Sequence, residues 1–284
     1  MATSTPTHNP SGPWKARFEA SQRRERVVRA RALELRRERD RLIADLRLAE
    51  QVQRSLLPRP LPSAPGLELG AAVRPSLHVA GDFYGAFRLD RERLGACLGD
   101  VMGHGVAAAL LSVYAMQALR TKRIAGTDYE IITPDHVLNS LNDAMIAADF
   151  PGSPFLTMVY GVFDSARRTW TYCQGGHPPA LLLRPGRPPI LLTDGGGPLL
   201  GVFPASYAQG EVELADGDRL VLYSDGVESI RWGRWGYGLE GLAALTSTRD
   251  DRSPQRLVDD ALALAEHDDR IADDVTVMVA QVSS

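Results

Sequence analysis

Residues 93–111 read RLGACLGDVMGHGVAAALL, and this stretch changes character within a few residues. The run 93–99 is short, apolar and bounded by charged residues, which indicates a buried β-strand. Glycines follow, and Gly105 to Arg123 is rich in Ala and Leu, which predicts a helix. Asp100 is placed where the strand gives way to the glycine-rich loop. The stretch therefore predicts a sheet with a neighbouring helix and a carboxylate at the junction.

Short apolar runs separated by Gly, Pro and Asp continue along most of the chain outside this stretch. Consecutive runs are mostly joined by short turns, which favours antiparallel pairing, and the predicted helices come in groups. The predicted class is therefore α+β, with sheets layered between helices. The other predicted strands cover 67–74, 83–89, 156–163, 169–174, 179–183, 210–214, 219–224 and 275–282, and the other predicted helices cover 135–148 and 254–267.

The segment 14–57 has a different composition, with neither Pro nor Gly and with many Arg, Glu, Leu and Ala residues. It predicts one long helix. Apolar residues recur in it every seven positions, as in a coiled coil that would pair two copies of the chain and regulate the rest. A helix lying on its own domain and a solvated basic arm are the alternatives. The seam consists of Val28, Ala32, Leu35, Leu42, Leu46, Ala49 and Leu56, and Arg39 and Gln53 interrupt it.

The segments around this helix complete the predicted domain organisation. Residues 1–13 are rich in Ser, Thr, Pro and Asn, which predicts a disordered tail. Four prolines lie within 58–66, a predicted linker, and 67–284 is the predicted main domain. Because little chain precedes the helix, we expect the helix, or an activator protein that docks on it, to supply any regulation.

Charge and composition restrict the classes of function. Residues 1–60 hold 14 Lys and Arg against 7 Asp and Glu, whereas 61–284 hold 18 against 28. The acidic main domain argues against a nucleic-acid substrate. Cys97 and Cys173 lie in apolar runs and lack the spacing of a zinc site or a disulfide framework. Because no apolar run approaches the ~18 residues of a membrane span and the polar start does not resemble a signal peptide, we expect a cytoplasmic protein.

Aspartates recur at the ends of apolar runs, next to glycine. Each alone would suggest an ordinary turn. Several carboxylates converging on one place would repel one another unless cations neutralised them, and Mg²⁺ and Mn²⁺ prefer oxygen ligands. The pattern therefore favours a two-metal site that activates a water. The residues are Asp82 in VAGDFYG, Asp100 in CLGDVMG, Asp225 in LYSDGV, and Asp273 and Asp274 in IADDVTV.

Blocks of sequence in a fixed order resemble the SpoIIE/RsbU-type branch of the PPM phosphatases. They include LLPRPLPSAPGLELGAAVRPSLHVAGDFYG at 56–85, LGDVMGHGVAAALL at 98–111, GGHPPALLLR at 175–184, GDRLVLYSDGVES at 217–229 and DDVTVMV at 273–279. The resemblance implies an α/β/β/α sandwich of mostly antiparallel sheets, and a protein serine/threonine phosphatase with two Mn²⁺ or Mg²⁺ ions.

The resemblance also implies roles for individual residues. Asp82 is expected to be one carboxylate ligand, Asp100 to bridge the two metals, and the Val101 carbonyl to be a further ligand. Asp225 would complete the site together with Asp273 or Asp274, of which Asp273 is favoured as the direct ligand.

The chain departs from the family pattern GGDFYD at Ala80 and Gly85. If the missing acid at Gly85 limits catalysis, Gly85→Asp should raise the rate. His104 lies four residues after Asp100, where a structural role at the start of the following helix is expected, and His177 in GGHPP is also expected to be structural.

The resemblance further implies a substrate and a pathway. The expected substrate is a phosphorylated STAS-type anti-sigma factor antagonist in the partner switching that controls sigma factors during stress responses. Two alternatives stay open. One is a catalytically weak or inactive dimeric scaffold of the same fold, and the other is a two-metal nuclease or phosphodiesterase, against which the acidic domain argues.

Overall fold

The computed structural model describes residues 13–126, 128–248, 252–265 and 273–283. The chain divides into two compact units, Met1–Ala49 and Glu50–Ser284. The predicted tail, apart from its last residue, lies outside the described residues. The dividing point lies seven residues before the end of the first helix, whereas the sequence suggested the linker at 58–66. No helix in the described part of the chain is both long and apolar enough to span a bilayer.

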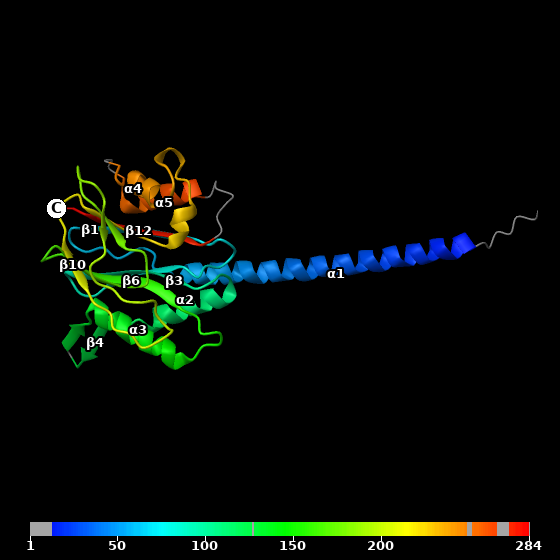
Figure 1. Ribbon diagram of the computed structural model, residues 1–284, viewed down its shortest axis with the longest axis horizontal. Coiled ribbons are helices and arrows are strands. Elements are labelled where there is room, and N and C mark those ends of the chain that lie inside the picture. Colours follow the sequence, from blue (N-terminus) through cyan, green and yellow to red (C-terminus); the bar gives the residue numbers. More distant parts are fainter. Residues whose placement is uncertain (1–12, 127, 249–251, 266–272, 284) are drawn as a thin grey trace, which may run out of the picture. The chain divides into compact units, whose positions relative to one another are not determined.

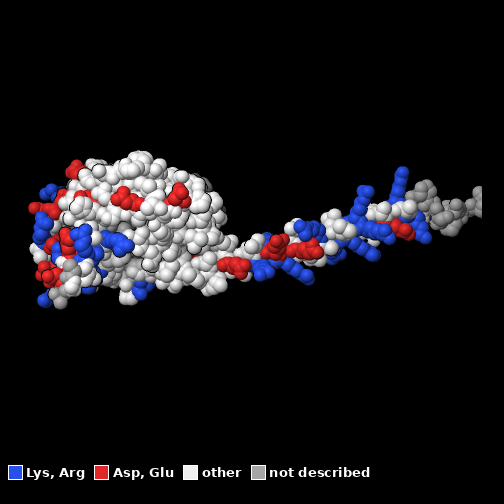
Figure 2. Space-filling view, turned by 90° about the horizontal axis from the view of Figure 1, so that it is seen from below, with Lys and Arg blue, Asp and Glu red and all other residues white. Residues whose placement is uncertain are grey.

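Helix α1 (Pro13–Leu56) contains 44 residues without interruption. Its side chains carry charges of both signs along most of its length (Figure 2), and some pair locally, as Arg31 does with Glu34 at 3.1 Å. Several apolar seam residues are exposed, including Val28, Leu35 and Leu42.

The second unit contains two five-stranded sheets. Every ladder between their named strands is antiparallel, which confirms the α+β class. The first sheet has the order β1 (Leu67–Arg74), β12 (Val275–Val282), β11 (Arg219–Tyr223), β8 (Ala180–Leu183) and β9 (Ile190–Leu192). The second has the order β10 (Gly210–Glu213), β7 (Thr169–Gly175), β6 (Leu156–Asp164), β3 (Arg93–Val101) and β2 (Phe83–Arg88).

Four helices cover the outer faces of the two sheets (Figure 1). Helices α4 (Gly238–Thr246) and α5 (Pro254–Ala265) pack on the first sheet, and α2 (Val106–Ala118) and α3 (Pro134–Ala148) pack on the second. A third apolar cluster fills the space between the sheets. These layers confirm the predicted sandwich. Both cysteines are buried and free.

Several elements differ from the prediction. The helix predicted over 105–123 ends at Ala118, because Leu119 is extended and residues 122–125 form strand β4 (Lys122–Ala125), which pairs with β5 (Asp128–Ile131). Neither strand of this small sheet was predicted, and α4 was missed as well. Two 3-10 turns, η1 (Asp225–Ser229) and η2 (Gly233–Trp235), follow β11.

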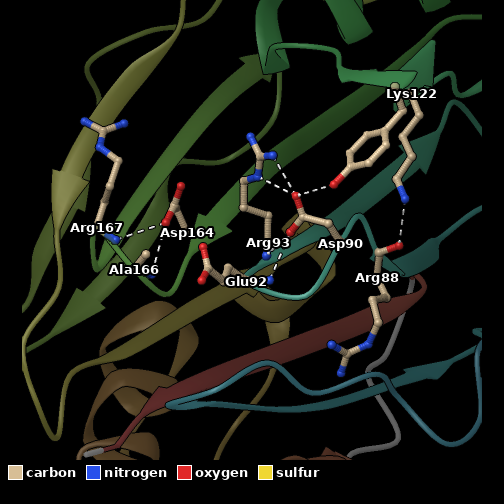
Figure 3. Close-up of polar contacts among 9 residues, drawn as sticks. Arg88, Asp90, Glu92, Arg93, Lys122, Asp164, Ala166 and Arg167 are labelled. Atoms are coloured by element: carbon tan, nitrogen blue, oxygen red, sulfur yellow. Dashed lines mark hydrogen bonds and ion pairs between the residues drawn. The ribbon is translucent and has the colours of Figure 1, made fainter. Parts of the chain in front are cut away.

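Aspartates close the turns at one end of the second sheet (Figure 3). Asp90, between β2 and β3, accepts hydrogen bonds from the Arg93 amide at 2.7 Å and the Arg93 Nε at 2.8 Å. Burial alone would raise the pKa of Asp90, but these bonds and the Arg93 charge lower it overall. Asp164, at the end of β6, similarly accepts hydrogen bonds from the backbone amides of Ala166 and Arg167. Asp90 and Asp164 thus stabilise the turns at this end of the sheet.

Gly85 lies in β2 and faces the layer of α2. A Cβ at this position would lie 2.8 Å from Met116 Cε, 2.8 Å from Phe87 Cζ and 2.9 Å from Cys97 Sγ. The site of the missing acid is therefore a closely packed apolar environment.

We predict that Gly85→Asp lowers stability and does not raise the rate. Any side chain at Gly85 overpacks this layer by about 1 to 3 kcal/mol, and a carboxylate adds an unpaired buried charge. Denaturant unfolding of Gly85→Asp and Gly85→Ala separates the two effects, with Asp the more destabilised. Equal stability of Gly85→Asp and the unaltered chain would contradict this.

His177, after β7, is a buried polar side chain. Its Nδ1 lies 2.9 Å from Thr157 Oγ1. Burial lowers the pKa of His177 to about 3, against the weaker opposing effect of the Tyr223 backbone. The folded protein therefore holds this imidazole neutral at neutral pH, as the structural role predicted for it requires.

We predict that this imidazole makes folding less favourable in acid. The unfolded chain protonates it near its ordinary pKa of 6.5, so stability falls as the pH drops from there toward about 3, by up to ~1.4 kcal/mol per pH unit. His177→Gln should flatten the curve of unfolding free energy against pH in that range. Parallel curves for His177→Gln and the unaltered chain would exclude this role.

Candidate metal centre

Four strand ends from the two sheets meet at the end of the sandwich opposite the Asp90 turn. Asp82 directly precedes β2, and Asp100 is the penultimate residue of β3 in the same sheet. Asp225 follows β11, and Asp273 and Asp274 precede β12 in the other sheet. Antiparallel pairing of β2 with β3 and of β11 with β12 places each group at one sheet edge.

Two hydrogen bonds join these edges across the sandwich. The Thr276 hydroxyl donates to Asp82 Oδ2 at 2.6 Å, and the Gly81 amide donates to Asp274 Oδ2 at 2.7 Å. These bonds join the loop before β2 to residues nearly 200 positions further along the chain. They bring the aspartates of the two sheets to one site.

Asp274 is almost fully buried, with 2% of its surface exposed. Its second oxygen, Oδ1, accepts hydrogen bonds from the Ser76 amide at 2.7 Å and the Ser76 hydroxyl at 2.9 Å. Both oxygens therefore hold the loop before β2. Charge-assisted bonds of this kind are the strong ones, so Asp274 organises the backbone around Asp82.

Two glycines permit the close approach of these loops. A Cβ at Gly81 would lie 2.8 Å from the Val101 carbonyl oxygen, and one at Gly226 would lie 2.0 Å from the Asp274 carbonyl oxygen. Real Cβ atoms do not approach backbone oxygens so closely. Glycine at these positions brings the loop of Asp82 against Val101 and the loop of Asp225 against Asp274.

Asp225 and Asp273 are exposed at this edge, and Asp100 is half-buried. Asp273 Oδ1 accepts a hydrogen bond from the Asp274 backbone amide at 2.8 Å. The site thus has a buried side, occupied by Asp82 and Asp274, and an open side.

The carboxylates repel one another at this edge. Burial, followed by the charge of Asp100, raises the pKa of Asp82 well above its ordinary value. Burial, followed by the charges of Asp225, Asp273 and Asp274, raises the pKa of Asp100 to about 7. Burial and the charge of Asp273 also raise the pKa of Asp225. This concentration of uncompensated negative charge is characteristic of functional sites.

The donor set suits hard divalent cations, because it consists of carboxylates and a backbone carbonyl. Among the described residues, no three His, Cys, Asp or Glu side chains gather closely enough to enclose a metal ion. Mg²⁺ commonly binds through one or two carboxylates and keeps several waters. The described residues thus form no ready-made cage, and the fit to these cations rests on the chemistry of the oxygen donors.

Ser76 and Thr276 are site residues that sequence reasoning missed. Thr276 could have been noticed as a polar residue within the otherwise apolar start of β12, where it is fully buried. His104 is exposed, and α2 begins after Gly105 without a side-chain cap, so nothing here supports the structural role expected of His104 at that helix start.

Comparison with known proteins agrees with this geometry. Residues 90–283 match the family model described as Stage II sporulation protein E (SpoIIE). The phosphoserine phosphatase RsbU of Bacillus subtilis is 30% identical over 192 residues, which cover 66% of this chain and 54% of RsbU. This chain thus spans about half of the length of that relative.

Solved structures share the fold. The crystal structure of the RsbU and RsbW domains of a Mycobacterium tuberculosis protein superposes with a TM-score of 0.64 at 27% identity, covering 79% of this chain and 63% of that one. The SiaA-PP2C domain of Pseudomonas aeruginosa superposes with a TM-score of 0.68 at 22% identity, covering 86% and 98%. Because the family model matches most of the second unit, including Asp100, Asp225, Asp273 and Asp274, the chain belongs to the SpoIIE family.

Proposed function

We propose that this chain is a metal-dependent protein serine/threonine phosphatase that hydrolyses phosphoserine or phosphothreonine on a partner protein. The observation that carries the proposal is the meeting of Asp82 and Asp100 with Asp225 and Asp273 at one edge, where their charges are uncompensated. Family membership and the name of the relative RsbU support the same reaction.

The carboxylates are proposed to hold two Mn²⁺ or Mg²⁺ ions, which would lower the pKa of a water molecule and neutralise charge on the phosphoryl group. Asp82 would be a ligand from the buried side, Asp100 lies between the two sides, and the Val101 carbonyl would add a backbone oxygen as a ligand. Asp225 and Asp273 serve from the open side, where a phosphorylated segment has access.

Asp273 is proposed as the direct ligand in preference to Asp274. Both oxygens of Asp274 accept hydrogen bonds from Ser76 and Gly81, whereas Asp273 is exposed and uses one oxygen for a neighbouring amide. Asp274 thus fixes the loop that carries Asp82, and the other aspartates are left for metal.

The proposed substrate is a phosphorylated STAS-type anti-sigma factor antagonist, within a cytoplasmic partner-switching system that governs sigma factors in stress responses. The relative RsbU is named a phosphoserine phosphatase, which supports a phosphoserine side chain as the substrate group. The excess of acidic residues in 61–284 disfavours nucleic acid. The inactive scaffold of the same fold stays the alternative, because the acid is missing at Gly85, which lies among Met116, Phe87 and Cys97.

Activity is predicted to require added Mn²⁺ or Mg²⁺ and to disappear with a chelator, since oxygen ligands bind these ions reversibly. Asp100→Ala and Asp225→Ala should each lower the rate on p-nitrophenyl phosphate and on a phospho-STAS protein by several orders of magnitude. Both variants should stay folded without metal, because each removes a repelling charge.

Glu68→Ala, at an exposed site near the far end of β1, is the matched control and should keep full activity. Full activity of Asp100→Ala with unchanged metal dependence would overturn the site, and cleavage of a DNA substrate would favour the nuclease alternative.

We also propose that α1 makes the protein a homodimer and that its pairing, or an activator docked on it, controls the phosphatase. Its exposed seam residues Val28, Leu35 and Leu42 would be buried only against a partner helix. The interrupting residue Arg39 suits a regulated rather than a permanent pair.

A double variant, Leu35→Glu with Leu42→Glu, is predicted to turn a dimer into a monomer in light scattering. Leu33→Glu, which changes an exposed leucine outside the seam, should stay dimeric. A monomeric unaltered chain would end the dimer proposal. Equal phosphatase rates for the dimeric and monomeric forms would leave the dimer but remove its control over activity.

A further inference from the structure

Gln53, in the last turn of α1, belongs to the same compact unit as the sheets. Its side-chain amide pairs with both backbone groups of one residue: Gln53 Nε2 donates to the Ala80 carbonyl at 2.7 Å, and the Ala80 amide donates to Gln53 Oε1 at 3.0 Å. One side chain thus satisfies Ala80 as a neighbouring strand would. We call this pair of bonds the Gln53 clasp.

The clasp acts two residues before Asp82. Ala80 is 1% exposed, so without the clasp a buried N–H and C=O would lose their partners, which destabilises a folded protein. The next residue, Gly81, is held by Asp274, and Asp82 itself is held by Thr276. Three successive residues are therefore fixed: Ala80 by the two bonds of the clasp, and Gly81 and Asp82 by one bond each from β12 or the loop before it.

The space beside this loop is not filled by packing. A cavity of about 210 Å³ lies between the end of α1, helix α2 and strand β2, and its lining includes Gln53, Leu56, Asp82 and Ser112. Hydrogen bonds rather than van der Waals contacts must therefore fix Asp82 on this side. Gln53 Nε2 also lies 3.4 Å from the Ser112 hydroxyl, which brings α2 into the same network.

We propose that Gln53 is a positioning residue for the metal centre, which fixes Ala80 and thereby aims the Asp82 carboxylate, so that metal affinity depends on the last turn of α1. This inference rests on the proposed function. Partners that orient a metal ligand typically change metal affinity by about 10- to 100-fold, whereas a bond that only stabilises the fold would leave the affinity unchanged.

The chain contains a matched control for this distinction. Gln255, on α5, makes the same pair of bonds with Ala71 on β1: the Ala71 amide donates to Gln255 Oε1 at 3.2 Å, and Gln255 Nε2 donates to the Ala71 carbonyl at 3.3 Å. Ala71 pairs with Met278, four residues beyond Asp274 along β12. This second clasp therefore has the same chemistry without contact with the loop of Asp82.

The test compares Gln53→Met with Gln255→Met in the full chain. Methionine keeps the length of the side chain and removes both hydrogen bonds. Mn²⁺ affinity is measured by calorimetric titration, and unfolding free energy is measured in denaturant with a chelator present. We expect both variants to lose stability, while only Gln53→Met binds Mn²⁺ about tenfold or more weakly.

Unchanged Mn²⁺ affinity in Gln53→Met, or an equal loss in Gln255→Met, would overturn the positioning role. An unaltered chain that binds no Mn²⁺ would overturn the proposed function itself. The two failures are therefore distinguishable.

A second measurement needs no substitution. Coupling between sites is reciprocal, so if the clasp strengthens metal binding, Mn²⁺ must strengthen the clasp. Added Mn²⁺ should slow amide hydrogen exchange at the end of α1, in residues 50–56, by a factor similar to the loss of affinity. Exchange at the start of α5 should not change. If Mn²⁺ does not change the exchange rates of residues 50–56, the inference is overturned. This result can be obtained even if Gln53→Met fails to fold.

Discussion

Repulsion among carboxylates confined to one edge of two sheets is the constraint on which this structure depends. A buried carboxylate costs free energy unless hydrogen bonds or opposite charges compensate it. At this edge few such bonds reach Asp82 and Asp100, and their pKa values are raised by burial and by one another. The protein thus holds together carboxyl groups whose charge its other residues do not neutralise.

The surrounding structure holds these groups together against that repulsion. Asp274 uses both oxygens to hold the preceding loop, Thr276 holds Asp82, and Gly81 and Gly226 let the backbones approach closely. The sandwich supplies the stability that this requires through three apolar clusters, one between the sheets and one beneath each pair of helices. The acids at the opposite end, Asp90 and Asp164, have ordinary turn partners, so the two ends of the same strands carry carboxylates of different character.

The sandwich and the aspartates could be predicted because their signals are local. Strand patterns flanked by glycine mark Asp100 and Asp225, and the ordered blocks of sequence indicate the layers. The role of Asp274 could not be predicted, because its partner Ser76 lies 198 positions away. Strand β4 could not be predicted, because Lys122 and Arg123 have the same helix-favouring composition as the residues before them. No residue type marks the end of α2 at Ala118. The bonds of Gln53 could not be predicted for a related reason, because within the apolar seam this residue reads as an interruption, while its partner Ala80 lies in the loop before β2.

The position of the unit boundary within α1 has a consequence for how such a chain can be altered or recombined. Residues 50–56 belong to the folded domain although they are helical, and the helix continues without a break on their N-terminal side. Because each residue of an α-helix turns the chain by about 100°, inserting or deleting one residue just before Glu50 changes the rotational phase of everything upstream relative to Gln53. Changes of about seven or about eleven residues nearly restore that phase, because they come close to whole numbers of helical turns. A different N-terminal module can therefore be joined to this domain only in helical register. The number of residues at the junction then determines how that module is rotated about the helix axis relative to Gln53.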